Sequence, residues 1–391
     1  MKRNLVDKLV ARLGAERGLM QVVAGPRQVG KTTAVRQALE ELGMGRMVSA
    51  DEPLRHDSTW LRQQWEVARA QARQSGRCVL AVDEIQKVAN WSESVKRLWD
   101  EDTRDGLDVR VVLLGSSQML LQRGLTESLA GRFELLRATH WSWPEMREAF
   151  GWDWQTYVHL GGYPGAARFR DDLDRWRDYV RFSLVETMVT RDVLMENTVH
   201  KPALLRTLFE LGCASSGQEL SLTKLLGQLQ DAGNTVTLAH YLSLLESAGM
   251  LSGLQKFAVD GARKRNSVPK FQVHNNALAA AVGAWSWPAG RDDPETWGRM
   301  VESAVGAHLL NSAVIEGWHL AYWREGGKEV DFVLSRGDRL LAIEVKSGRR
   351  KGSLAGMSAF LARHPRAKPL LVGADGIAVE EFLAGRVSDW L

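Results

Sequence analysis

Residues 25–32 read Gly25-Pro26-Arg27-Gln28-Val29-Gly30-Lys31-Thr32, which matches the pattern G-x-x-x-x-G-K-[ST] in full. The five residues before this stretch predict a short buried strand, and residues 33–42 predict a helix with apolar positions on one face. A strand, a glycine-bearing turn and a helix N-terminus together bind anions, because backbone N–H groups and the helix dipole point at one place. The stretch therefore predicts a site for the phosphates of ATP.

Two side chains of this stretch have separate predicted roles. We expect Lys31 to reach the β- and γ-phosphates and the Thr32 hydroxyl to be a ligand for Mg²⁺. The alternative is an ordinary glycine-rich turn between a strand and a helix. The predicted nucleotide-binding residues are those of the stretch, the threonine after it and one later serine: Gly25, Pro26, Arg27, Gln28, Val29, Gly30, Lys31, Thr32, Thr33 and Ser116.

Composition indicates the broad class of protein. With 391 residues, 45% hydrophobic and 25% charged, the chain has the profile of a globular protein with two or three domains. The net charge of +4 is a weak indication of a polyanionic partner. Two cysteines cannot form a disulfide framework and suit a reducing compartment. No signal peptide or run of 18 apolar residues is present, so we expect a cytoplasmic protein without a membrane span.

A second chemical feature follows about fifty residues after the phosphate loop. Residues 78–84 predict an apolar strand that ends in Asp83 and Glu84. In a parallel sheet the carboxyl ends of the strands lie at one edge, so these acids should lie beside the phosphate loop. We expect Asp83 to hold the Mg²⁺ shell and Glu84 to orient and polarise the attacking water. The alternative is that the two acids cap the following helix.

Two further positions are candidates in the same domain. A predicted strand at residues 109–114 is followed by Ser116 and Ser117, and one of these fills the place of a residue that senses the γ-phosphate. A helix cap is the alternative. Arg132 precedes the last predicted strand, where an arginine can stabilise charge on the transferring phosphate, in cis or from a neighbouring subunit. The alternative for Arg132 is a surface ion pair.

Four segments carry a family resemblance. In order along the chain they are GPRQVGKTT, VDEIQ, LGSSQ and SLAGRFE. They resemble the prokaryotic AAA-type ATPases that carry a C-terminal nuclease-like domain of unknown function. Tyr163-Pro164-Gly165, Thr190-Arg191-Asp192 and EVDFVL…IEVKSG extend the resemblance over nearly the whole chain. The resemblance implies an ATPase domain, a winged helix and a nuclease-like domain, and we also expect a homo-oligomer.

The middle of the chain predicts a winged helix. Residues 222–229 and 237–247 predict two helices, with Thr235 or Thr237 capping the second. Two short strands and a basic turn follow. Arg263, Lys264 and Arg265 at the tip of this hairpin suit contacts with DNA phosphates. The alternative is a winged helix that packs against protein.

The last part of the chain contains a second chemical pattern. Asp331 and Glu344-Val345-Lys346 fit the D…(E/D)-x-K pattern of restriction-like nucleases on predicted neighbouring strands. Glu344 and Lys346 share one face because side chains alternate along a strand. We expect Asp331 and Glu344 to bind Mg²⁺, Glu302 to add a further ligand, and Lys346 to activate water or stabilise the phosphate. The alternative is a strand with an exposed Glu–Lys pair.

The sequence therefore predicts an α/β protein in three parts. They are an AAA-type P-loop ATPase domain (1–150), a helical and winged-helix domain (151–275) and a restriction-nuclease-like α/β domain (276–391). Predicted catalytic residues are Lys31, Glu84, Arg132, Asp331, Glu344 and Lys346, and predicted metal ligands are Thr32, Asp83, Glu302, Asp331 and Glu344.

These parts predict a protein that hydrolyses ATP with Mg²⁺ and acts on DNA by binding, remodelling or translocation, with metal-dependent cleavage left open. The basic hairpin and the basic residues within 346–368 are the predicted DNA contacts. The alternative function is an ATP-driven conformational switch in signalling or defence. In that alternative, the C-terminal domains bind partners without cleaving them.

Overall fold

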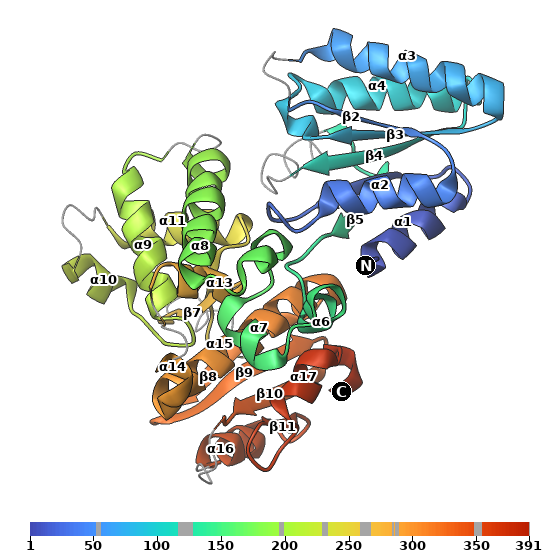
Figure 1. Cartoon of the computed structure of the whole chain (residues 1–391). Coiled ribbons are helices and arrows are strands. Elements are labelled where there is room, and N and C mark those ends of the chain that lie inside the picture. The colour runs from blue at the N-terminus through green and yellow to red at the C-terminus, as the bar shows by residue number, and fades with distance from the viewer. Residues whose placement is uncertain are drawn as a thin grey trace. The chain divides into compact units, whose positions relative to one another are not determined.

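The computed structural model describes residues 1–51, 56–115, 128–194, 199–228, 234–258, 267–283, 285, 289–347 and 354–390. Two compact units are present: the N-terminal unit Met1–Ala138 and the C-terminal unit Thr139–Leu391 (Figure 1). No helix in the described ranges is long and apolar enough to span a membrane. The predicted residues that lie outside the described ranges are Ser116, Ser117, Arg263, Lys264, Arg265, Arg349, Arg350 and Lys351.

A parallel sheet forms the centre of the N-terminal unit. Its strands are ordered β2-β3-β4-β1-β5, and every neighbouring pair is parallel. β1, β3 and β4 are buried along their whole length, as expected for strands covered on both faces. The strand bounds are β1 Met20–Ala24, β2 Arg46–Ser49, β3 Cys78–Asp83, β4 Val109–Gly115 and β5 Phe133–Arg137. The sheet confirms the predicted parallel architecture, with one strand inserted between the phosphate-loop strand and the acidic strand.

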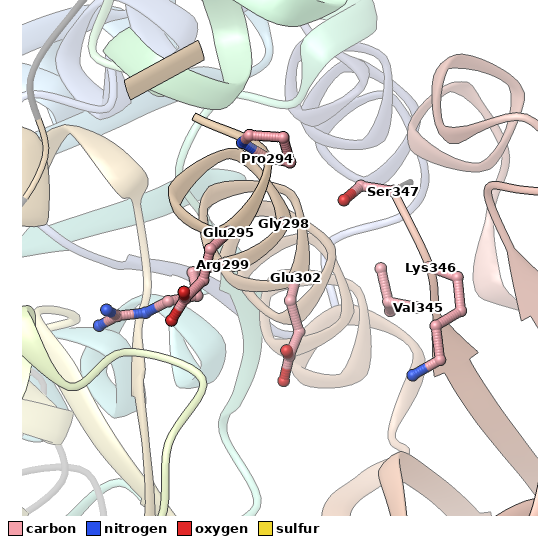
Figure 2. Close-up of a pocket in the computed structure, with 8 residues that line it drawn as sticks. All are labelled: Pro294, Glu295, Gly298, Arg299, Glu302, Val345, Lys346 and Ser347. Atoms are coloured by element: carbon pink, nitrogen blue, oxygen red, sulfur yellow. The ribbon is translucent and has the colours of Figure 1, made fainter. Parts of the chain in front are cut away.

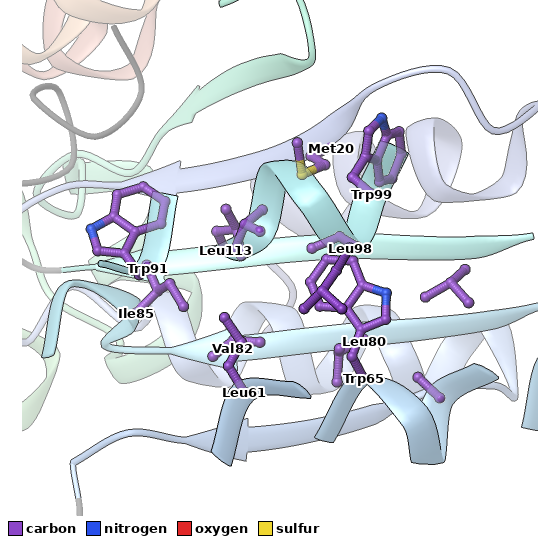
Figure 3. Close-up of a cluster of buried hydrophobic side chains, with 14 of the residues drawn as sticks. Met20, Leu61, Trp65, Leu80, Val82, Ile85, Trp91, Leu98, Trp99 and Leu113 are labelled. Carbon is purple, nitrogen blue, oxygen red and sulfur yellow. The ribbon is translucent and has the colours of Figure 1, made fainter. Parts of the chain in front are cut away.

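Helices cover both faces of this sheet. α1 (Asn4–Gly14) and α2 (Lys31–Leu42) pack on one face, and α3 (Ser58–Ser75) and α4 (Trp91–Arg104) on the other (Figure 1). Alternating side chains of β3 enter the two cores. Figure 3 shows Leu80 and Val82 on the side of Leu61 and Trp65 of α3. The phosphate loop and the acidic strand are therefore held by two separate hydrophobic cores.

Helices and two sheets build the C-terminal unit. A hairpin of β6 (Leu251–Leu254) and β7 (Lys270–Val273) follows α10 and α11, the element order predicted for a winged helix. The helices before the long helix α15 are α6 Trp143–Phe150, α7 Trp154–Leu160, α8 Leu173–Asp178, α9 Pro202–Ala214, α10 Leu222–Gln228, α11 Thr235–Ser247, α13 Asn276–Ala281 and α14 Ala289–Asp292. Segments of 3-10 helix (Pro164–Phe169 and Val387–Trp390) and of π-helix (Tyr179–Val185 and Met188–Leu194) complete the helical part.

The predicted cap of α11 was wrong. Its N-terminal cap is Asn234, whose side-chain oxygen accepts a hydrogen bond from the Thr237 backbone N–H at 2.9 Å. α11 begins at Thr235, two residues before the predicted start, which places both threonines inside the first turn. The physical reason is that an asparagine carbonyl reaches the third helical N–H as readily as a threonine hydroxyl does.

A mixed sheet ends the chain. Its order is β11-β10-β9-β8, with antiparallel pairs from β8 to β10 and a parallel pair between β10 and β11. Helix α15 (Pro294–Glu316) contacts β8 and β10 of this sheet as well as β7 of the hairpin. The remaining bounds are β8 His319–Glu325, β9 Lys328–Arg336, β10 Arg339–Val345, α16 Ala355–Arg363, β11 Lys368–Val372 and α17 Val379–Ala384. This sheet places the predicted acids of β9 and β10 on neighbouring strands.

Gly25 is required where the chain leaves β1. A Cβ atom at this position would lie 1.9 Å from the carbonyl oxygen of Ala138. The Ala138 backbone N–H also donates to the carbonyl oxygen of Ala24 at 2.8 Å, so neither backbone segment can move away alone. Only a residue without a side chain fits between the two strands here.

We predict that Gly25→Ala destabilises the ligand-free protein by about 1–3 kcal/mol, because the added methyl group overlaps backbone atoms. Gly18→Ala is the matched control, since apart from its two chain neighbours no described residue has a heavy atom within 4 Å of a Cβ at that position. Thermal unfolding of both variants measures the difference. Equal unfolding midpoints for the two variants would show that the turn relaxes around the methyl group.

Candidate nucleotide-binding and nuclease-like sites

The phosphate loop forms the turn between β1 and α2. Gln28 has a φ of 60° and Gly30 a φ of 85°, so both residues adopt the left-handed conformation. Left-handed residues in such a turn direct successive N–H groups to one side and create an anion-binding concavity. The strand, turn and helix predicted from the sequence are therefore all present, and α2 begins at Lys31 itself.

Lys31 folds back over its own loop. Its Nζ atom donates hydrogen bonds to the carbonyl oxygens of Gly25 at 2.8 Å and Pro26 at 2.7 Å. The side chain is buried against the loop. These two carbonyl oxygens are neutral, so a phosphate in the concavity would attract this ammonium more strongly than they do.

Thr32 and Asp83 meet at the edge of the sheet. The Thr32 hydroxyl donates to Oδ2 of Asp83 at 2.8 Å, and the backbone N–H of Glu84 donates to Oδ1 at 3.0 Å. Burial raises the pKa of Asp83, and the Thr32 hydrogen bond acts in the opposite direction. The predicted proximity of Asp83 to the phosphate loop is thus observed directly.

The donor atoms here fit Mg²⁺. A hydroxyl oxygen and a carboxylate are oxygen ligands of the kind that Mg²⁺ prefers. Across the described ranges, no group of three or more His, Cys, Asp or Glu side chains could hold a metal ion without other ligands. Mg²⁺ at nucleotide sites needs fewer protein ligands, because substrate phosphates and water complete its shell.

Glu84 leaves the line of β3. Its φ of 52° is left-handed, and its carboxylate accepts a hydrogen bond from the side-chain amide of Gln86. The short 3-10 helix Ile85–Lys87 follows, and the Glu84 side chain makes no capping hydrogen bond to it. Glu84, which is half-buried, thus occupies the N-cap position of this helix without the side-chain hydrogen bond of the helix-cap alternative.

Arg132 directly precedes β5. Its Nε and Nη2 atoms donate to the two carboxylate oxygens of Asp100 on α4, at 2.9 and 3.1 Å. About a third of the Arg132 side chain is exposed. This bidentate contact is the ion pair that the sequence left as an alternative to a phosphate-contacting arginine.

The predicted acids of the C-terminal unit lie on adjacent strands. Asp331 on β9 accepts a hydrogen bond at Oδ2 from the backbone N–H of Val345 at 2.8 Å. Glu344 on β10 pairs through Oε1 with the ammonium of Lys346 at 2.6 Å. The predicted common face of Glu344 and Lys346 is therefore confirmed, but the pair is not the exposed one of the alternative, because Glu344 is buried.

Glu344 lacks a full set of partners. Burial and the nearby charge of Asp331 raise the pKa of Glu344 to about 7, against the effect of Lys346. Its second carboxylate oxygen is buried and has no hydrogen-bond partner among the described residues. An unpartnered carboxylate oxygen beside a second carboxylate fits a hard divalent cation with oxygen ligands. Asp331 and Glu344 therefore fit the predicted Mg²⁺.

Sequence reasoning missed Lys270. This residue of β7 is fully buried, and its ammonium lies 2.7 Å from Glu302 Oε1, 3.7 Å from the Glu329 carboxylate and 4.0 Å from that of Asp331. Glu302, predicted as a further metal ligand, contacts this lysine. We call Glu302, Glu329, Asp331 and Glu344 the acidic cluster. The available signal was a lysine at the start of a short strand that contains Phe271 and Val273, although it did not indicate which acids the lysine would meet.

A cavity of about 320 Å³ adjoins the acidic cluster. Figure 2 shows Glu302 entering it from α15 and Lys346 from the end of β10. The lining residues are Pro294, Glu295, Gly298, Arg299, Glu302, Val345, Lys346 and Ser347. The cavity gives a ligand access to both a carboxylate and an ammonium group.

Known families cover most of the chain. Residues 18–147 match the AAA domain family, and residues 151–289 and 297–382 match two domains of unknown function, DUF8612 and DUF4143. The uncharacterized protein MJ1544 of Methanocaldococcus jannaschii is 22% identical over 275 residues. That match covers 65% of this chain and 58% of the relative, so this chain spans less than two thirds of the relative's length.

A solved structure supports the fold. The Walker-type ATPase PABY2304 of Pyrococcus abyssi aligns with a TM-score of 0.51 at 12% identity, over 72% of this chain and 95% of that one. At this identity the likeness concerns the fold. Together with the family match at residues 18–147, the phosphate loop and the Thr32–Asp83 contact identify the first domain. The chain carries an AAA-type P-loop ATPase domain, followed by two domains of families without an assigned function.

Proposed function

We propose that the N-terminal unit of this chain binds ATP with Mg²⁺ and hydrolyses it. The observation that carries this proposal is the Thr32–Asp83 hydrogen bond of 2.8 Å, which joins two oxygen ligands from distant segments beside Lys31. The loop N–H groups and Lys31 bind the phosphates, and Thr32 and Asp83 hold the ion. Bound Mg²⁺ supplies neutralisation of the charge that develops on the phosphate oxygens.

Glu84 is the proposed residue for water activation. It directly follows Asp83, so its carboxylate lies at the same edge of the sheet as the phosphate loop. The Gln86 amide, which donates to this carboxylate, restricts its orientation. Glu84 would accept hydrogen-bond donation from a water molecule and polarise it for attack on the terminal phosphate.

We further propose that the C-terminal unit acts on DNA. The supporting observations are the Asp331–Glu344–Lys346 arrangement, the adjoining cavity and exposed Arg366 and Lys368. In this proposal Asp331 and Glu344 hold a divalent ion and Lys346 stabilises the attacked phosphate, which would give metal-dependent cleavage. The division into ATPase (1–150), winged-helix (151–275) and nuclease-like (276–391) parts belongs to the same proposal.

The second candidate is an ATP-driven switch whose C-terminal part binds its partner without cleavage. Lys270 favours this candidate, because its positive charge already neutralises part of the acidic cluster. ATP turnover with and without single-stranded, duplex and branched DNA separates the two candidates. Stimulation by DNA supports action on DNA, and nucleotide-dependent assembly that is insensitive to DNA supports the switch.

We predict that Lys31→Ala weakens ATP binding, because the phosphates lose a cationic partner. Glu84→Gln should bind ATP normally and lose at least about 100-fold in turnover, since an amide polarises water poorly. Labelled-nucleotide binding and phosphate release measure the two effects. Glu93→Gln, an exposed acid on α4, is the control. Turnover by Glu84→Gln at the parent rate would remove Glu84 from this role.

Arg132 allows a matched comparison with its partner. Arg132→Ala and Asp100→Ala break the same ion pair, which is worth at most about 1 kcal/mol at this exposure. If Arg132 contacts the transferring phosphate, only Arg132→Ala should lose turnover, by at least about 100-fold. Equal turnover in the two variants would leave the arginine a structural role.

The same variant tests for a homo-oligomer in which Arg132 acts on a neighbouring subunit. A mixture of Arg132→Ala and Lys31→Ala chains should regain turnover if the arginine acts in trans, since one composite site would then be intact. A mixture no more active than its separate components would place the arginine in cis. Sedimentation of the parent with and without ATP measures the oligomeric state alongside.

DNA binding has a salt-dependent signature. Reversal of Arg263, Lys264 and Arg265 to Glu should weaken binding to all sequences alike and reduce the salt slope by roughly one unit for each phosphate that is no longer bound. Reversal of three exposed cations of the N-terminal unit, Arg62, Lys96 and Arg97, is the control. A titration with salt that shows equal slopes for both triple variants would locate the DNA contacts elsewhere.

A further inference from the structure

Lys270 is a charged side chain without exposure to solvent. It is 0% exposed and lies on β7, a strand of the hairpin that follows α11. Removing an ammonium group from water is costly unless anionic and hydrogen-bonding partners surround it. The position of Lys270 therefore has to be explained by what its Nζ atom contacts.

Oxygen atoms from two elements surround this ammonium. Nζ donates to Glu302 of α15 at 2.7 Å and to the main-chain oxygen of Asp331 on β9 at 3.2 Å. The carboxylates of Glu329 and Asp331 lie 3.7 and 4.0 Å away. The ring of Phe332 lies 4.8 Å from Nζ and adds a cation–π contact. This environment is that of a bound cation.

The acids are arranged around the ammonium group. Burial alone would lower the pKa of Lys270, but the charges of Glu302 and Asp331 outweigh it and hold this pKa above its ordinary value. With Lys270 in place, no three acids in the part of the chain that the structure describes form a site for a metal ion. Glu302, Glu329 and Asp331 instead point their oxygens at Nζ.

The second lysine of this region has a different partner. Lys346 pairs with Glu344, whose other carboxylate oxygen has no hydrogen-bond partner among the residues that the structure describes. The acidic cluster thus has one position filled by Lys270, among Glu302, Glu329 and Asp331. It has a separate position beside Asp331 and Glu344, which is the one assigned above to Mg²⁺.

We propose that Lys270 is a tethered cation. It holds the position that a divalent metal would otherwise take among Glu302, Glu329 and Asp331, so that Glu302 is not a metal ligand in this chain. This proposal rests on the nuclease-like site of the proposed function, but it concerns which cation these acids bind, and it can hold whether or not the site cleaves DNA. The hairpin strand β7 supplies the charge that its neighbours need.

The test is Lys270→Met in the full chain, with Mn²⁺ alone as the probe and no nucleotide. In EDTA the variant should unfold roughly 5–15 °C below the parent, because three carboxylates lose their cation. Mn²⁺ should raise the unfolding midpoint of the variant more than that of the parent. Equilibrium dialysis with metal analysis should count one more Mn²⁺ per chain in the variant. Lys328→Met, at an exposed lysine of β9, should match the parent in both measurements.

A charge-balanced variant covers the case in which Lys270→Met does not fold. Lys270→Met with Glu302→Gln removes one charge of each sign, and it should fold in EDTA and bind the parent's number of Mn²⁺ ions. An extra Mn²⁺ in this double variant would overturn the proposal, because Glu302 would then not define the position. A Lys270→Met variant that is as stable as the parent in EDTA, or that binds no extra ion, would also overturn it.

The unfolding midpoint and the Mn²⁺ count test the tethered cation independently of the proposed ATPase and nuclease activities. Neither the midpoint nor the metal count depends on ATP turnover or on cleavage of DNA. A parent that cleaves no DNA, with a variant that gains one Mn²⁺, would remove the nuclease activity and keep the tethered cation. A parent that cleaves DNA, with a variant that binds no additional Mn²⁺, would keep the nuclease activity and remove the tethered cation.

Discussion

The hydrogen bond between Thr32 and Asp83 is the contact on which the N-terminal unit depends. Its two residues are 51 positions apart, and they meet because β1 and β3 end at the same edge of one parallel sheet. Burial of the Asp83 carboxylate costs free energy and raises its pKa. Hydrogen bonds from the Thr32 hydroxyl and the Glu84 backbone N–H offset part of this cost. Lys31 and Glu84 are direct sequence neighbours of the pair, so the same contact fixes the positions of the phosphate-binding lysine and of the acid proposed to polarise water.

The cost of burying charge also applies in the C-terminal unit, where several carboxylates lie close together. Acids from α15, β9 and β10 gather where the helix crosses the sheet, and buried like charges cannot all stay ionised without cations. Lys346, the residue directly after β10, neutralises part of this charge through its ion pair with Glu344. Lys270 neutralises another part of this charge from β7, which belongs to the hairpin and not to the mixed sheet. The hairpin and the sheet are therefore held together by charge as well as by packing.

Sequence patterns predicted the parts of this arrangement that depend on local spacing. The apolar run of β3 ending in Asp83, and the alternation that puts Glu344 beside Lys346, follow from periods of a few residues. They could not predict the contact of Lys270 with Glu302, 32 positions away, because no local pattern indicates which acids a buried lysine will meet. For a related reason, the sequence left open whether Arg132 contacts a phosphate or forms a surface ion pair. The position of Asp100 relative to it depends on how α4 packs on the sheet, which spacing along the chain does not specify.

Lys31 and Lys270 are both buried, but different ligands could compete for them. Lys31 is bound to two neutral carbonyl oxygens, and an incoming phosphate brings negative charge that competes well for the ammonium. Lys270 is bound to the carboxylates of Glu302 and Asp331. A neutral or anionic ligand does not compete with Lys270 for these carboxylates, and only another cation can take its place beside them. The first arrangement suits a site that fills and empties with each nucleotide. The second suits a fixed charge, and it leaves the position beside Asp331 and Glu344 as the part of the acidic cluster that can exchange a cation with solvent.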